Sequence, residues 1–233
     1  MKSLFYSYDR EIENSYIITL KDNENSQRLS KRCQESCEKV GQNYKIWDAY
    51  DGVKNTIVEP EHSKDSDFMR MLKVTDHYLT RGEVACALSH ISLWVHCVKI
   101  DKPIVILEHD AIMLKKIESH HFYNSIVFLG SAEWVEKGWP LIPIPPHGTD
   151  GHNKHFICRA HAYSIDPPIA KNLLSHVLKM GICDPLDIMI RADLFNIVHQ
   201  GVFAYDKSEP QNTTIMSRPT EGRTTFKNDW LAK

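Results

Sequence analysis

Two carboxylates follow a short apolar run near the middle of the chain. Glu108 and Asp110 come directly after Ile104–Leu107, with His109 between them. Residues two positions apart on an extended chain point the same way, and carboxylate oxygens are ligands that Mg²⁺ and Mn²⁺ favour. Such a metal bridges to phosphate groups and acts as a Lewis acid. The acids therefore indicate metal-assisted chemistry on a phosphate-bearing substrate, and by themselves they would also permit a metal-dependent hydrolase.

The position of the pair bears on this interpretation. A continuous β-branched run such as Ile104–Leu107, bounded by the turn signal Asp101–Pro103, is typical of a central strand in a parallel sheet. Ligands of open α/β sheets bind beyond the carboxyl ends of the strands, which is where Glu108 and Asp110 fall. The plainer alternative is that the two acids cap a following helix or face solvent.

The segment before this run predicts a buried helix. Thr80 and Glu83 have the spacing of a capping box, in which each side chain satisfies a backbone N–H of the other residue. Apolar residues then recur at helical spacing as far as Val98, and more of them fill the other faces. Ser89 and His90 are polar residues inside this helix, and buried polar groups need partners.

The remaining elements predict one α/β domain with insertions. Strands are expected at residues 16–20, 44–47, 126–130 and 162–165, and helices at about 26–40, 167–179 and 185–195. Asp184 is a possible N-cap of the last helix. Residues 53–76 read as irregular, the proline-rich segment 139–148 reads as a stiff loop, and the tail after Gly201 has weak periodicity.

Composition excludes several classes of protein. The 233 residues carry a formal charge of −2 and 25% charged residues, which does not resemble a histone or a dedicated non-specific nucleic-acid binder. The amino terminus lacks the apolar core of a signal peptide, and no run approaches the length of a membrane-spanning helix. The six cysteines contain no CxxC pair, so a disulfide framework is not expected. The sequence predicts a cytoplasmic globular protein with no evident obligate protein partner.

The helix and the acidic run together resemble glycosyltransferase family 25, the lipooligosaccharide-biosynthesis enzymes. Residues 80–94 followed by 106–110 are similar to the family pattern GEIGCxLSHxxLW and LEDD. The resemblance covers about residues 14–215. Supporting matches are the opening strand with Arg28 after it, Asp51-Gly52, Phe128-Leu129-Gly130, Ala162–Ile165 and Pro185-Leu186-Asp187.

The resemblance implies a GT-A-like (Rossmann-type) fold, with a mixed sheet and flanking helices in a single domain over residues 1–233. The nucleotide-sugar half would span about 1–130 and the acceptor half about 131–233. It also implies a nucleotide-sugar donor, Mg²⁺ or Mn²⁺, and inversion at the transferred sugar carbon.

Site roles follow from the same resemblance. Asp110 would bind the metal, and Glu108 would contact the ribose or a metal-bound water. His109 stands where the family usually has an Asp, and its imidazole can ligate a metal but adds no negative charge. The donor phosphates and sugar would further meet Arg28, Arg81 and Ser89, although either Arg also reads as an exposed, solvated side chain.

An inverting transfer needs a general base for the acceptor hydroxyl. Asp187 is the first candidate, with a role as a first-turn helix acid as its alternative. His90 is the second candidate and also reads as a satisfied core histidine. Glu83 reads first as a capping residue, which would lie near the ligand end of the sheet.

Two acceptors and one non-enzymatic function remain open. The family favours a lipooligosaccharide or other surface glycan, whereas the compact chain and His109 are similar to divergent members of tailed phages. On the phage interpretation the acceptor is 5-hydroxymethylcytosine in duplex DNA, with Arg218, Arg223 and Lys227 on phosphates. Because His109 replaces the usual Asp, a third interpretation is a non-catalytic protein that binds a sugar or nucleotide.

Overall fold

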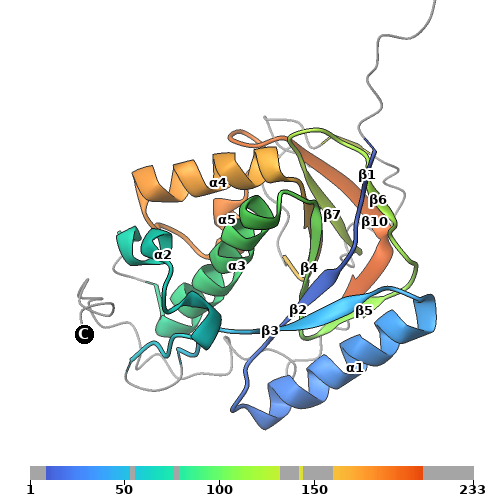
Figure 1. The fold of residues 1–233 in the computed structure, drawn as a ribbon, viewed down its shortest axis with the longest axis horizontal. Coiled ribbons are helices and arrows are strands. Elements are labelled where there is room, and N and C mark those ends of the chain that lie inside the picture. Colours follow the sequence, from blue (N-terminus) through green and yellow to red (C-terminus); the bar gives the residue numbers. More distant parts are fainter. Residues whose placement is uncertain (1–8, 53–55, 76–78, 132–141, 144–159, 207–233) are drawn as a thin grey trace, which may run out of the picture.

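A mixed β-sheet forms the centre of the computed structural model, which describes residues 9–52, 56–75, 79–131, 142–143 and 160–206. Figure 1 shows helices on both faces of this sheet. The strand order is β3-β2-β4-β9-β7-β10-β5, with β8 paired to β10. The strands are β2 (Ser15–Thr19), β3 (Tyr44–Asp48), β4 (Ile104–Glu108), β5 (Ala111–Met113), β7 (Ile126–Ser131), β8 (Ile142–Pro143), β9 (Ala162–Ile165) and β10 (Ile197–Asp206). A separate pair joins β1 (Arg10–Glu11) to β6 (Ser119–His120).

Strand direction changes at the middle of the sheet. β2 is parallel to both β3 and β4, whereas β9 is antiparallel to β4 and to β7. β7 is then parallel to β10, which β5 flanks in the antiparallel sense. The predicted strand at Ile104–Leu107 is confirmed as a central one. Its parallel environment is confirmed only toward β2.

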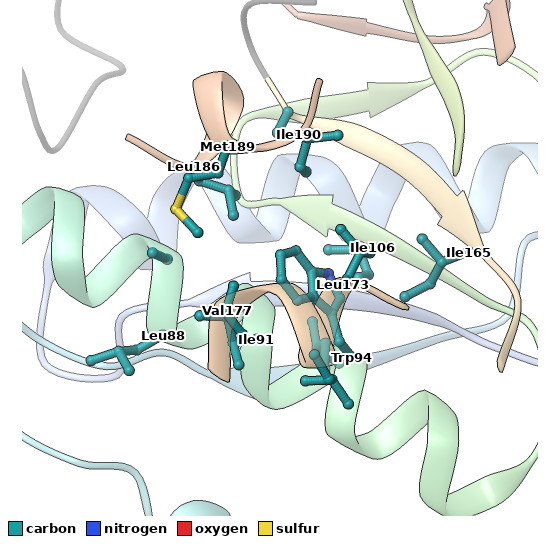
Figure 2. Close-up of a cluster of buried hydrophobic side chains, with 14 of the residues drawn as sticks. Leu88, Ile91, Trp94, Ile106, Ile165, Leu173, Val177, Leu186, Met189 and Ile190 are labelled. Carbon is teal, nitrogen blue, oxygen red and sulfur yellow. The ribbon is translucent and has the colours of Figure 1, made fainter. Parts of the chain in front are cut away.

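Side chains alternate between two cores, one on each face of the sheet. Ile17 and Val105 pack with Cys33 and Cys37 of α1 (Glu24–Val40), so α1 covers one face. The other face is covered by α3 (Arg81–Ile100) and α4 (Pro167–Met180), as Figure 1 shows. Figure 2 shows the second core, where side chains of α3, β4, β9, α4 and α5 (Leu186–Met189) meet: Leu88, Ile91, Trp94, Ile106, Ile165, Leu173, Val177, Leu186 and Met189.

The predicted capping box at the start of α3 is confirmed. The Thr80 hydroxyl accepts a hydrogen bond from the Glu83 N–H at 3.2 Å, and Glu83 Oε2 accepts one from the Thr80 N–H at 2.7 Å. The helix ends at Ile100, and its C-cap residue Asp101 has a left-handed φ of 51°. Most of α3 is buried between the sheet and α4, as its nearly continuous apolar surface predicts.

Two predicted segments differ from the structure. The helix expected at 185–195 ends at Met189, because Ile190 adopts an extended conformation, and Pro185 rather than Asp184 occupies its N-cap position. The tail after Gly201 continues β10 to Asp206. The pairing of β10 with β7 shifts register between His199 and Ala204, and this bulge hides the alternation that would reveal a strand.

The segment expected to be irregular contains short helical turns. These are η1 (Glu61–Ser63) and α2 (Asp67–Met71). None of the helices in the described ranges combines the length and the apolar character that crossing a bilayer requires.

Candidate functional site

A pocket opens beyond the carboxyl ends of β2 and β4, beside the first half of α3. Its cavity volume is about 80 Å³. Ile18, Leu20 and Ala49 supply apolar lining from the strand ends and the following loops. The lining residues with reactive or polar side chains are Tyr50, Cys86, Ser89, His90, Glu108 and His109.

Four acids gather around one thiol in this region. Burial raises the pKa of Cys86 well above its usual value, and the carboxylates of Glu108, Asp187, Asp110 and Glu83 raise it further. The acids come from β4, α5, the turn after β4 and the first turn of α3. The structure therefore brings together the acids that the sequence singled out, although they are up to 104 positions apart in the chain (187 − 83).

His90 lies directly against Glu108. Its Nε2 is 3.4 Å from Glu108 Oε1, and its side chain is 1% exposed while that of Glu108 is 30% exposed. Burial lowers the pKa of His90 to about 3, against an opposing effect of the Asp187 carboxylate. The imidazole is therefore neutral at physiological pH.

The other nitrogen of His90 belongs to a buried hydrogen-bond network. His90 Nδ1 is 2.7 Å from the hydroxyl oxygen of Tyr163, and the indole N–H of Trp94 donates to the same oxygen at 3.1 Å. The His90 and Tyr163 rings stack with an interplanar angle of 8°. Tyr163 lies in β9, so this network ties α3 to the antiparallel strand of the sheet.

His109 and Asp110 occupy a turn, so the chain does not stay extended beyond Glu108. His109 Nδ1 is 3.2 Å from the hydroxyl of Ser26 in α1. Together with Cys37 and burial, the Asp110 carboxylate raises the pKa of Cys33 in α1, and it also acts on Cys86 in α3. The backbone of Asp110 lies against α1, where the Arg32 guanidinium donates to the Asp110 carbonyl at 3.3 Å. Strand β5 follows the turn, so the alternative in which the acids cap a following helix is wrong.

Ser89 has a structural task within the pocket wall. Its hydroxyl donates to the Ala85 carbonyl at 2.8 Å and accepts the Tyr50 N–H at 3.0 Å. Gly52, in the same loop as Tyr50, packs so tightly that a Cβ there would lie 2.3 Å from the carbonyl oxygen of Arg81. These contacts fix the loop after β3 to the first three turns of α3.

The predicted basic residues are spread more widely. Arg28 is exposed on α1 and donates to the Asn25 side chain at 2.8 Å, and Arg81 is half-buried at the first position of α3. Neither of them lines the pocket. The predicted acceptor residues Arg218, Arg223 and Lys227 lie outside the described residues.

Three site residues were missed in the sequence. In the sequence, Cys86 is interpreted only as part of an apolar face of α3, although it matches the Cys of the family pattern GEIGCxLSHxxLW. In the sequence, Trp94 and Tyr163 have the character of core residues. Nothing near them in the chain indicates which partners their indole N–H and hydroxyl groups would meet. Their signal was indirect, since a buried His90 requires a hydrogen-bond partner.

Cys86 and His90 also join Glu108 in a group with the geometry of metal ligands. One ligand atom of each residue lies within 4.8 Å of the others. The sequence predicted a set of Asp110, Glu108 and His109, so the two sets share only Glu108. A thiol, an imidazole and a carboxylate are the donor set that Zn²⁺ takes, whereas Mg²⁺ takes oxygens.

Comparison with known proteins identifies one family. Residues 12–140 match the model of Glycosyltransferase family 25 (LPS biosynthesis protein). This match covers more than half of the 233 residues and includes α3, β4 and the turn with the acids. No curated protein matches the chain.

Proposed function

Because the chain belongs to glycosyltransferase family 25, we propose that it moves a sugar from a nucleotide-sugar to a hydroxyl of a lipooligosaccharide or related surface glycan. The observation that carries the proposal is the pocket beyond the strand ends, which Glu108 and Cys86 line, with the carboxylates of Glu83, Asp110 and Asp187 acting on that thiol as well. This pocket lies largely within the segment that the family model matches. The lipooligosaccharide acceptor follows the description of that family.

The pocket has complementary surfaces for a nucleotide-sugar. Its apolar part at Ile18, Leu20 and Ala49 suits the base and the ribose ring, and Glu108 can accept hydrogen bonds from ribose hydroxyls. A site beyond the ends of β2 and β4 is also where a GT-A-like, Rossmann-type domain would hold its nucleotide. On this proposal the first half of the chain binds the donor and the later half contributes to the acceptor side.

A divalent cation suits the charge of this region. A diphosphate brought close to four carboxylates meets like charges, and a cation between them removes the repulsion. Glu108 and Asp110 supply hard oxygen ligands for Mg²⁺ or Mn²⁺, with His109 in the adjacent position. When bound, the ion would act as a Lewis acid that stabilises charge on the departing diphosphate.

Asp187 is the general base in this proposal. Its carboxylate acts on both His90 and Cys86, so it lies near the pocket, and it is half-buried in the first turn of α5. The acceptor oxygen forms a bond to the anomeric carbon as the bond from that carbon to the diphosphate oxygen breaks. The hydroxyl proton passes to Asp187 and the nucleoside diphosphate leaves, which inverts the configuration.

The proposal is tested with a panel of nucleotide-sugars and Mn²⁺, with product read by mass spectrometry. A lipooligosaccharide fragment and hydroxymethylated duplex DNA are offered as parallel acceptors. We expect transfer to the glycan only, and loss of that transfer in Asp110→Asn and Asp187→Asn. Glu118→Gln is the matched control, because Glu118 is an exposed acid paired with Lys116.

Three results would contradict the proposal. Transfer to DNA alone would replace the acceptor with 5-hydroxymethylcytosine. Tight nucleotide binding without transfer or donor hydrolysis would make the chain a non-catalytic member of the family. Full activity in EDTA-treated protein would remove the metal from the mechanism.

A further inference from the structure

His90 is a deeply buried polar residue whose outer nitrogen faces the pocket. Its side chain is 1% exposed, and Nε2 makes no hydrogen bond to the residues that the structure describes. Glu108 Oε1 lies 3.4 Å from this nitrogen, slightly farther than in a formed hydrogen bond. Buried polar atoms in native proteins nearly always have a partner. The state of this nitrogen therefore requires an explanation.

The Tyr163 hydroxyl determines which nitrogen of His90 carries the hydrogen. The indole N–H of Trp94 can only donate, so the Tyr163 oxygen accepts that bond. The hydrogen of the Tyr163 hydroxyl is then available for His90 Nδ1 at 2.7 Å. If Nδ1 carried a hydrogen instead, the buried tyrosine hydrogen would have no acceptor among the described residues. Nδ1 is thus the acceptor, and the hydrogen of the neutral ring is on Nε2.

The Glu108 side of the ring leads to the same tautomer. A bare Nε2 would direct its lone pair toward a carboxylate oxygen, and the two would repel. An Nε2–H instead directs a donor toward that oxygen. The Glu108 side chain is 30% exposed, and a small rotation of it would shorten the contact to a hydrogen bond.

We propose that His90 is a positioning residue whose Nε2–H tautomer is fixed by Tyr163 and Trp94 and which orients the Glu108 carboxylate toward the nucleotide-sugar. The proposal rests on the function proposed above for Glu108. A donor on one carboxylate oxygen fixes the plane of the group, and with it the direction in which the carboxylate meets the ribose or the metal. Preorganised polar groups of this kind act without reorganisation during the reaction.

The same tautomer argues against two other functions of His90. A general base needs a lone pair that faces the substrate, and the one lone pair of the ring faces Tyr163. A soft-metal site with Cys86 and Glu108 needs the lone pair on Nε2, where this tautomer carries a hydrogen. In this tautomer the group of Cys86, His90 and Glu108 is therefore not a zinc site, and the 3.4 Å contact between His90 Nε2 and Glu108 Oε1 serves to orient the carboxylate.

The tautomer can be observed directly by ¹⁵N NMR of the histidine-labelled full chain, without any substrate. We expect His90, assigned by its absence in His90→Gln, to show a hydrogen on Nε2 and an accepting Nδ1. In Tyr163→Phe the ring should lose this preference and populate both tautomers. A hydrogen on Nδ1 in the wild-type chain would overturn the proposal.

Kinetics test whether the tautomer orients Glu108. His90→Leu keeps an apolar volume but removes the donor, and we expect the rate of sugar transfer to fall by about tenfold to a hundredfold. His90→Gln retains an N–H donor and should recover most of that loss. A folded His90→Leu with full activity would contradict the positioning role, as would a folded His90→Gln that is as slow as His90→Leu.

A titration with Co²⁺ tests whether Cys86, His90 and Glu108 form a zinc site instead. We expect no thiolate-to-Co²⁺ absorption band in the wild-type chain, and such a band that disappears in Cys86→Ser would overturn the proposal. The NMR result does not depend on turnover. If no donor is ever transferred and the Nε2–H tautomer is still observed, the proposed glycosyl transfer fails while the fixed tautomer of His90 stands.

Discussion

Two of the buried histidines in the described part of the chain have opposite hydrogen-bond environments. His90 in α3 and His120 in β6 are each 1% exposed, and burial lowers the pKa of His90 to about 3 and that of His120 to about 4. Both ring nitrogens of His120 meet hydroxyls, Nδ1 at 2.9 Å from Ser164 and Nε2 at 3.2 Å from Ser125. Among the described residues His90 meets a hydroxyl at Nδ1 alone, and its Nε2 lies 3.4 Å from Glu108, which lines the pocket with it.

Strand β9 supplies both networks from neighbouring positions. Tyr163 points to the face that α3 covers and contacts His90, whereas Ser164 points to the opposite face and contacts His120. Asp166, directly after the strand, completes the second network by accepting the backbone N–H of Ser125. The fully satisfied network fixes structure, and the network with an open donor at a pocket is available for function. Histidine burial alone does not separate the two cases.

Removal of the Asp166 carboxylate should have the largest effect, and on stability alone. This buried carboxylate accepts the N–H groups of Asn124 at 2.8 Å, Ser125 at 3.3 Å and Ile169 at 3.3 Å, the last as the N-cap of α4. We expect Asp166→Ala to lower the unfolding free energy by about 3 kcal/mol, measured by urea titration. Activity per folded molecule should be unchanged. A loss of activity without a loss of stability would mean that the network of Asp166 and His120 is not purely structural.

Substitution of Glu108 should have the opposite profile. We expect Glu108→Gln to reduce sugar transfer by about a hundredfold, because an amide neither attracts a cation nor accepts bonds on both arms. The midpoint of thermal unfolding should stay close to that of the wild type. Glu118→Gln serves as the control, and an active Glu108→Gln would remove Glu108 from the site.

Acidification should weaken the structural network in a defined pH range. The folded state holds His120 neutral with a pKa of about 4, whereas the unfolded chain takes up a proton near pH 6.5. The unfolded state thus binds more protons between these values, and stability falls as the pH falls. Between pH 7 and pH 5 we expect His120 to account for about 2 kcal/mol of lost unfolding free energy. Urea titrations of His120→Gln should show a flatter pH dependence, and an unchanged slope would contradict this assignment.

The capping box at the start of α3 tests the boundary between the two regions. Glu83 lies near the pocket acids, yet its carboxylate accepts the N–H and the hydroxyl of Thr80 at 2.7 and 2.9 Å. We expect Thr80→Ala and Glu83→Gln each to lower the unfolding free energy by about 1 kcal/mol and to leave kcat unchanged. A drop in kcat confined to Glu83→Gln would place Glu83 with the catalytic groups.

The pattern of neighbouring residues was sufficient to predict the helix and the strand that carry the site. The capping box and the apolar faces predicted α3, and the β-branched run predicted β4, because both signals depend on neighbours in the chain. The gathering of Glu83, Glu108 and Asp187 followed from the rule that ligands bind beyond strand ends together with the family resemblance. The roles of these acids stay predictions until activity is measured.

Strand direction and network partners could not be predicted in the same way. A buried strand reads as apolar whichever way it runs, so nothing local showed that β9 is antiparallel and begins where β4 ends. This reversal brings Tyr163 to His90. Cys86 lacked a signal for the same reason, since a cysteine on a buried helix resembles any small apolar residue.

The close approach of Gly52 to Arg81 has a consequence for how the pocket can diversify. Any side chain at position 52 would collide with the backbone of the first turn of α3, so this rim cannot vary without displacing the helix that carries His90. Variation in donor preference is therefore left to lining residues such as Leu20 and Ala85. A library aimed at new nucleotide-sugars would best randomise those two positions and keep Gly52 constant.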